Sequence, residues 1–274
     1  MSIGRAIAHF MPGVPGEMKP MFTAHVAPGL RAPVPSGGIH QVRLKTFGLP
    51  ESTVNDRLTG IEAEHGVIIG YRAHFPEIEV KVLARATDAA TAERIAEKAA
   101  GVVRSRLEDV VFAEGDVTFA EAVGSLLRTR SLTFGTAESC TGGLVGALVT
   151  EQAGASDFFR GAIVSYDDSI KREILGVDGD TIARVGAVSA EVARAMAEGA
   201  RRVLRADVAL AITGIAGPGG GTATKPVGLV HFAVSTAAGT TDEHFVFPSD
   251  RQRVRLRAAY AGLALVRRVV EAAR

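Results

Sequence analysis

The sequence is short of cysteine, long apolar runs and surplus charge, and each shortage excludes a class of protein. A single cysteine among 274 residues cannot form a disulfide within the chain, so we expect a reducing, cytoplasmic location. No apolar run approaches the roughly 20 residues that cross a bilayer, and the first residues lack the apolar core of a signal peptide, so no membrane partner is expected. The net charge of +1 gives no strong nucleic-acid signal.

Lysine is also scarce, because only six of the 31 basic residues are lysines. Where any cation would serve, this chain uses arginine. A desolvated lysine can lose its proton and act as a base, whereas arginine effectively cannot. Only Lys171 and Lys225 lie beyond residue 115. These two are therefore the candidates for a catalytic amine in that half, although before their location is considered an ordinary surface lysine is the favoured interpretation of each.

The first 115 residues divide into an irregular start and a small α+β unit. Residues 1–38 are rich in proline and glycine turns, with one possible short helix at 17–22. Residues 39–115 predict a β-α-β-β-α-β unit, with strands at 39–47, 67–71, 77–84 and 110–112 and helices at 50–58 and 88–107, the second capped by Asp88. A nucleic-acid-binding KH module needs a G-x-x-G loop. Gly66-Val-Ile-Ile-Gly70 has the wrong spacing and reads as a strand, so the unit is interpreted as structural.

Residues 116–274 predict a larger domain in which strands and helices alternate. The expected helices are 119–129, 142–152, 168–175, 190–204 with Ser189 as cap, and 250–272; Val192, Met196 and Val203 are expected on one face of the fourth. The expected strands are 131–136, 161–166, 207–212, 228–235 and 243–247. Such alternation predicts a three-layer α/β/α sandwich.

Two loops that leave apolar strands are rich in glycine and hydroxyl groups, namely residues 138–143 and 213–222. Ligands of open α/β sheets bind at the carboxyl ends of the strands, so two such loops would form a cradle for a phosphate or a developing oxyanion. Neither loop is a Walker A motif or a dinucleotide fingerprint. The alternative is that their glycines only permit close packing of helix against strand.

The first loop carries two candidate nucleophiles, Ser139 and Cys140. No histidine has an evident triad context, since His231 is expected inside a strand and His244 near the start of one, and the histidines lack metal-ligand spacing. Lys171 is the better base, because it follows Tyr166 by five residues just beyond a strand end. A lone cysteine is more often a small buried residue.

Arg251, at the start of the last helix, has a planar guanidinium suited to an anionic group. The alternative is an ordinary arginine of a first helical turn. Asp167 and Asp168 lie close enough in sequence to Lys171 to hold it charged.

Six ordered motifs in residues 116–274 resemble one family. They are Ala137-Glu-Ser-Cys-Thr-Gly-Gly143, Ser165-Tyr-Asp-Asp-Ser-Ile-Lys171, Gly186-Ala-Val-Ser189, Thr213-Gly-Ile-Ala-Gly-Pro-Gly-Gly220, Lys225-Pro-Val-Gly228 and the helix start at Asp250-Arg251. Together they are similar to the CinA C-terminal domain, the nicotinamide-nucleotide amidohydrolase domain. The resemblance implies hydrolysis of nicotinamide mononucleotide (NMN) to nicotinate mononucleotide and ammonia in NAD salvage, without a metal or organic cofactor.

The resemblance also implies roles for individual residues. It makes Ser139 the nucleophile and Lys171 the base, with Tyr166 assisting. The expected substrate-binding residues are Thr141, Gly142, Gly143, Thr213, Gly214, Gly217, Gly219 and Arg251. The amides around Thr141–Gly143 would stabilise the oxyanion, while the second loop and Arg251 would hold ribose and phosphate.

The rest of the chain resembles a shortened CinA. Residues 1–38 resemble the end of a molybdopterin-binding-like domain and a linker, 39–115 the KH-like domain, and 116–274 the amidohydrolase domain. Because most of the first domain is absent, its pyrophosphatase activity is not expected here. The resemblance implies self-association into a homo-oligomer. Two alternatives stay open: a non-catalytic accessory protein in competence or the DNA damage response, and a nucleotide-binding protein without turnover.

Overall fold

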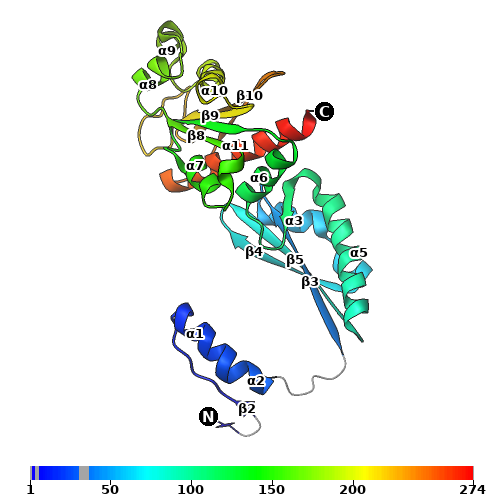
Figure 1. Cartoon of the computed structure of the whole chain (residues 1–274). Coiled ribbons are helices and arrows are strands. Elements are labelled where there is room, and N and C mark those ends of the chain that lie inside the picture. Colours follow the sequence, from blue (N-terminus) through cyan, green and yellow to red (C-terminus); the bar gives the residue numbers. More distant parts are fainter. Residues whose placement is uncertain (1, 4–5, 31–36, 274) are drawn as a thin grey trace.

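The computed structural model describes residues 2–3, 6–30 and 37–273 (Figure 1). At the N-terminus, β1 (Ser2–Ile3) pairs with β2 (Ala6–Ile7), and a helical stretch follows as α1 (Pro15–Met21), the π-helix η1 (Phe22–Val26) and α2 (Ala27–Leu30). Proline in the first turn favours such a start. The helix predicted at 17–22 is confirmed and is part of a longer helical stretch. Residues 8–14 are irregular as predicted, whereas the irregular assignment is wrong for β1, β2 and the rest of the helical stretch. Part of the predicted linker, residues 31–36, lies outside the described residues.

The small unit has the predicted β-α-β-β-α-β order, with one helix added. Its antiparallel sheet has the order β4-β5-β3-β6, from β3 (Gly38–Thr46), β4 (Val67–His74), β5 (Glu77–Ala86) and β6 (Val111–Glu114). The helices are α3 (Glu51–Leu58), α4 (Ile61–His65) and α5 (Ala89–Leu107), and the 3-10 turn η2 (Glu108–Val110) leads into β6. Asp88 caps α5 as predicted, since its carboxylate accepts the Thr91 N–H at 2.8 Å.

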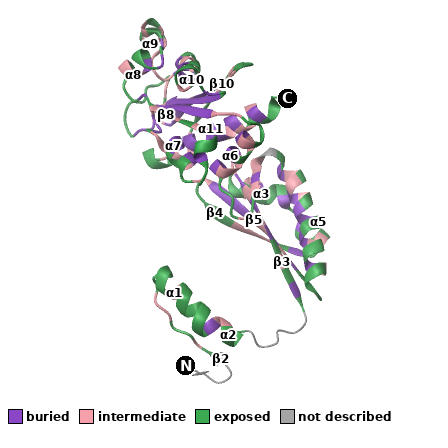
Figure 2. Ribbon diagram, in the orientation of Figure 1, coloured by how far each residue is buried: buried purple, intermediate pink, exposed green. Residues whose placement is uncertain are grey.

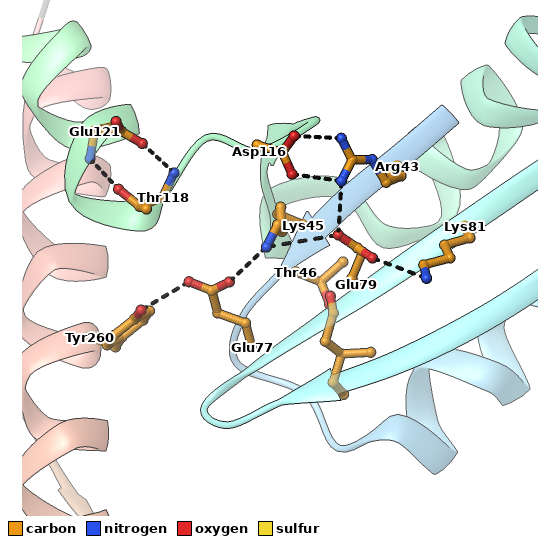
Figure 3. Close-up of polar contacts among 11 residues, drawn as sticks. Arg43, Lys45, Thr46, Glu77, Glu79, Lys81, Asp116, Thr118, Glu121 and Tyr260 are labelled. Atoms are coloured by element: carbon orange, nitrogen blue, oxygen red, sulfur yellow. Dashed lines mark hydrogen bonds and ion pairs between the residues drawn. The ribbon is translucent and has the colours of Figure 1, made fainter. Parts of the chain in front are cut away.

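The two faces of this sheet differ in chemistry because strand residues alternate. Leu44, Val80 and Val82 are fully buried in the core shared with α5. Charged residues of β3 and β5 take the alternate positions, and Figure 3 shows them in contact with one another. Gly66 caps the end of α4 with φ +66°, and β4 begins at the next residue. The segment that starts with Gly66 therefore continues as the predicted strand and does not form the G-x-x-G loop of a nucleic-acid-binding KH module.

The larger unit is the predicted three-layer α/β/α sandwich. Its sheet has the order β11-β10-β9-β7-β8, made from β7 (Phe134–Glu138), β8 (Phe159–Val164), β9 (Val208–Gly214), β10 (Leu229–Thr236) and β11 (Gly239–Val246). One layer contains α6 (Phe119–Thr129), α7 (Leu144–Thr150) and α11 (Arg251–Ala272); the other contains α8 (Asp168–Glu173), α9 (Gly179–Val185) and α10 (Ala190–Leu204). A 3-10 turn, η3 (Ala155–Asp157), precedes β8. Figure 2 shows the buried strands between these layers.

Besides other shifts of a few residues at the ends of elements, such as β8, which covers 159–164 and not 161–166, four details differ from the sequence prediction. The strand expected at 131–136 begins at Phe134, because Thr133 is held by Asp207, whose carboxylate accepts its N–H and hydroxyl. Helix α9 was not predicted, although Asp178 caps it. Val203 is 45% exposed, because the buried stripe of α10 ends at Ala200, a turn before the helix ends. His244 lies in the second half of β11, stacked on His231 with ring centroids 5.2 Å apart.

The sheet brings four chain segments to one edge. Strands β7, β8 and β9 are parallel, and β11 points the same way, because β10 is antiparallel to both of its neighbours. The segments after all four strands therefore start at the same edge, and α11 begins there too. This edge is the crevice expected from the sequence.

Candidate active site

Ser139 follows β7 directly, between the ends of two neighbouring strands. Its N–H donates to the Ile212 carbonyl of β9 at 2.9 Å, and the Ser165 N–H after β8 donates to the Glu138 carbonyl at 2.9 Å. Ser139 is half-buried, and its hydroxyl makes no hydrogen bond within the part of the chain that the structure describes. The hydroxyl is thus accessible at the edge where the segments meet.

Lys171 is buried at the same edge, with 1% of its surface exposed. Its Nζ donates to the Tyr166 carbonyl at 3.1 Å and to Asp168 Oδ1 at 3.0 Å. Asp167 caps α8 by accepting the Ser169 N–H at 2.8 Å, which starts the helical turn that carries Lys171 inward. Ser139 and Lys171 lie on neighbouring segments, but their side chains are not hydrogen-bonded here.

Tyr166, Gly217 and Arg251 meet through one guanidinium. Arg251 Nη1 donates to the Gly217 carbonyl at 2.8 Å, and Nη2 donates to the Tyr166 hydroxyl at 3.1 Å. Tyr166 is 62% exposed, and only its backbone carbonyl contacts Lys171. Arg251 is therefore more than an ordinary arginine of a first helical turn, since it joins the segments after β8 and β9.

The turn after Ser139 depends on two glycines with positive φ. Gly142 has φ +60° and its N–H donates to the Ser139 carbonyl at 3.1 Å, while Gly143 has φ +90° and precedes α7. Residues other than glycine rarely adopt these φ values. Thr141 and Ser165 are fully buried nearby, and among the described residues their hydroxyls have no hydrogen-bond partner. Two unsatisfied hydroxyls thus lie at this edge.

The second predicted loop is partly structural. Thr213 is buried and its hydroxyl donates to the Ala187 carbonyl at 2.8 Å; a Cβ on Gly214 would lie 2.8 Å from the Leu229 carbonyl oxygen. Lys225 Nζ donates to the Val188 carbonyl at 2.6 Å, as a scaffold contact. Gly219 is exposed with open space around it. Gly219 is thus the predicted loop residue with surface left for a ligand, whereas Gly217 is buried and contributes the carbonyl that accepts from Arg251.

Cys140 is a poor nucleophile in this position. It is 5% exposed, and burial raises the pKa of its thiol to about 12. At pH 8 roughly one molecule in 10⁴ would carry the reactive thiolate. This favours Ser139 over its neighbour.

We predict that Cys140→Ala keeps the catalytic rate at this site within about threefold of wild type, because the buried thiol packs as a small apolar side chain. Incubation of the wild type with iodoacetamide at pH 8 should likewise leave turnover intact over an hour. Rapid inactivation by the reagent, with protection by substrate, would return Cys140 to the list of nucleophiles.

Glu138 was missed by the sequence reasoning as a residue with its own role. It is fully buried, and its carboxylate accepts the N–H groups of Val145 at 3.0 Å and Gly146 at 2.9 Å. These are first-turn amides of α7, which have no partner within the helix. Glu138 therefore fixes the helix start that shapes the Ser139 turn; its place directly before Ser139 at the strand end was the available signal.

Glu138→Gln is expected to lower the free energy of unfolding by about 1–3 kcal/mol. The NH₂ group of glutamine takes the place of one carboxylate oxygen, so one of the two buried N–H donors of α7 loses its acceptor. Urea unfolding followed by circular dichroism measures this as a lower midpoint with an unchanged m-value. Glu93→Gln, on the exposed side of α5, is the matched control. Equal midpoints for the two variants would show that Glu138 does not hold α7.

Arg255 is the second residue that was missed. Its Nη2 donates to the Thr141 carbonyl at 2.6 Å, across 114 positions of sequence. It lies one turn after Arg251 on α11, so the arginine-rich start of this helix was the available signal. Arg251 and Arg255 together contact the segments after β7, β8 and β9.

The remaining features do not involve the predicted site residues. A cavity of about 300 Å³ lies at the junction of the two units, lined by Phe47, Val110, Phe119, Phe245 and Phe247 among others, and it includes none of the predicted site residues. Among the described residues, no group of three or more His, Cys, Asp or Glu side chains is arranged to hold a metal ion. None of the helices described is long and apolar enough to cross a membrane.

Comparison with known proteins agrees with both units. The CinA C-terminal domain model matches residues 116–270, and the model of the damage-inducible protein CinA KH domain matches residues 41–113. A CinA-like protein of Geobacter sulfurreducens is 41% identical over 97% of this chain and 65% of its own length. A putative competence-damage inducible protein of Desulforudis audaxviator is 40% identical over 96% of this chain and 64% of its own length. The chain thus spans a little less than two thirds of these curated relatives.

Solved structures resemble the chain over about half its length. The competence/damage inducible protein CihA from Agrobacterium tumefaciens is 39% identical, with a TM-score of 0.54, and the match covers 55% of this chain and 93% of that one. A competence-damaged protein superfamily member from Escherichia coli is 31% identical, with a TM-score of 0.53, covering 59% of this chain and 97% of its own.

Proposed function

Because this chain belongs to the CinA family, we propose that it hydrolyses the carboxamide of nicotinamide mononucleotide, releasing ammonia and nicotinate mononucleotide. The observation that carries the proposal is that a candidate nucleophile and a candidate base lie at the same edge of the sheet. Ser139 offers a free hydroxyl there, and Lys171 offers a buried amine with one carboxylate contact, from Asp168. A Ser–Lys pair is one way to activate a serine when no histidine serves as base.

In the proposed reaction, Lys171 Nζ in its neutral form takes the proton of Ser139 as Oγ attacks the carboxamide carbon. The tetrahedral intermediate collapses when Lys171 returns the proton to the departing nitrogen, which leaves as ammonia. The nicotinoyl ester on Ser139 is then attacked by water, with Lys171 again taking and returning a proton. A rotation of Lys171 away from Asp168 and the Tyr166 carbonyl precedes the first step, because both contacts now occupy its donors.

The surrounding groups have supporting roles in the proposal. The N–H of Gly143 stabilises the oxyanion, because it is an amide of this turn that donates no hydrogen bond within the described residues, whereas Glu138 accepts the N–H groups of Val145 and Gly146. The loop after β9 forms the wall for the ribose: Gly219 is its exposed part, and Thr213, Gly214 and Gly217 support it from the buried side. Arg251 binds the phosphate with its fork, exchanging its contact with Tyr166 for a charged partner. Tyr166 assists by closing over the bound nucleotide.

The test is release of ammonia from nicotinamide mononucleotide by the purified chain, with nicotinate mononucleotide identified by mass spectrometry. Binding of the nucleotide without ammonia release would favour a nucleotide-binding protein. Neither binding nor turnover would favour the accessory role in competence or DNA damage that the relatives' names mention. We also propose that residues 39–115 and 116–274 are separate domains and that the chain self-associates, which light scattering would measure.

A further inference from the structure

The first turns of α11 carry arginine at every second position: Arg251, Arg253, Arg255 and Arg257. Residues four apart lie on the same side of a helix, so these arginines form two pairs on different sides. The buried residues Val254 and Ala258 occupy a third side and pack into the core of the sandwich.

The first pair contacts the candidate site. Arg251 donates to Gly217 and Tyr166, and Arg255 donates to Thr141, so the pair reaches the segments after all three parallel strands. The positions of these segments are therefore tied to the position of one short stretch of helix.

The second pair contacts the small unit. The guanidinium carbons of Arg253 and Arg257 lie over the ring of Phe75, at 5.3 and 5.2 Å from its centroid. Phe75 lies in the tight turn between β4 and β5. Arginine over an aromatic face is an attractive arrangement, stronger where water is excluded.

The same turn is also held by a hydrogen bond to Glu77, which lies two residues after Phe75. The Tyr260 hydroxyl of α11 donates to Glu77 Oε1 at 2.9 Å (Figure 3). Glu77 is 5% exposed and also pairs with Lys45, Nζ to Oε2, at 3.4 Å. Burial and the adjacent carboxylate raise the pKa of Tyr260, so the phenol stays a donor across the usual pH range.

We propose that the β4–β5 turn of the small unit is a positioning element for the candidate site, with Phe75 as its positioning residue acting through α11. Helix ends open more readily than helix centres, and the Arg251–Arg257 stretch is such an end. The turn holds this end from outside while the core holds it from inside. Arg251 and Arg255 are thereby kept where they fix the three loop segments. The kinetic part of this inference rests on the proposed amidohydrolase function.

The experiment compares Phe75→Ala with Phe75→Tyr, which keeps the ring, and with Ile68→Ala, which trims an exposed side chain of β4. In Phe75→Ala we expect faster hydrogen exchange at the amides of residues 139–143 and 215–221, and a kcat per folded molecule lower by about tenfold, since small misplacements of site groups are costly. Both controls should match wild type.

The hydrogen-exchange measurement tests the inference independently of any enzymatic activity. If wild type releases no ammonia, the proposed function fails, and the exchange at the two loop segments still tests Phe75. Loop exchange in Phe75→Ala that equals that in Ile68→Ala overturns the inference. A uniform rise in exchange over both units, with a lower unfolding midpoint, also overturns it, because Phe75 would then contribute only to general stability.

Discussion

Ser139→Ala is expected to lower kcat for ammonia release from nicotinamide mononucleotide by about 10³-fold or more, because removing a nucleophile removes the covalent route. The affinity for the nucleotide should change little, since the proposed binding groups lie on Arg251 and the loop after β9. Ser139 is half-buried and its hydroxyl has no partner among the described residues, so the substitution should not destabilise the fold. Single-turnover kinetics and calorimetric titration measure the two quantities separately.

The matched control is Ser125→Ala, which removes an exposed serine hydroxyl from α6. It should leave both kcat and affinity at wild-type values. A second check uses hydroxylamine, which intercepts an acyl ester: wild type should form the hydroxamate and Ser139→Ala should not. Retention of more than a tenth of wild-type kcat by Ser139→Ala would show that the hydroxyl is not the nucleophile.

The fold class could be predicted where local signals agree. Helices α6 and α10 have the predicted bounds, because caps at their starts coincide with a periodic apolar face. The run at 207–212 became a central strand because it is apolar on both faces. Where a distant residue decides, prediction failed: Asp207 binds Thr133 across 74 positions and delays the start of β7.

The candidate site shows the same division. Ser139, Lys171 and Arg251 could be selected because each follows a predicted strand at the edge where ligands bind. Glu138 and Arg255 were missed although their positions were suggestive, since the contacts that define their roles appear only in the folded chain. The carboxylate of Asp168 was foreseen as a competitor for Lys171, and the structure contains that contact. The catalytic roles of all these residues remain predictions.

Lys171→Met is expected to lower kcat by about 10²–10⁴-fold, the usual contribution of a general base. The substitution fits the space, because methionine approximates the lysine stem and the side chain is 1% exposed. It leaves Asp168 without its partner, but Asp168 is half-exposed and can turn to water. The measurement is steady-state ammonia release corrected for the folded fraction, with Lys98→Met on the exposed side of α5 as control.

Lys171→Arg separates a base from a structural cation. Arginine keeps the positive charge and can still contact Asp168 and the Tyr166 carbonyl, but it cannot give up its proton at any working pH. If Lys171 is the base, the arginine variant should be as inactive as the methionine variant while its unfolding midpoint stays nearer to wild type. If Lys171 only holds α8 against β8, arginine should recover much of the turnover. That recovery would leave Ser139 without a base, because no described residue other than Lys171 places a buried amine at this edge.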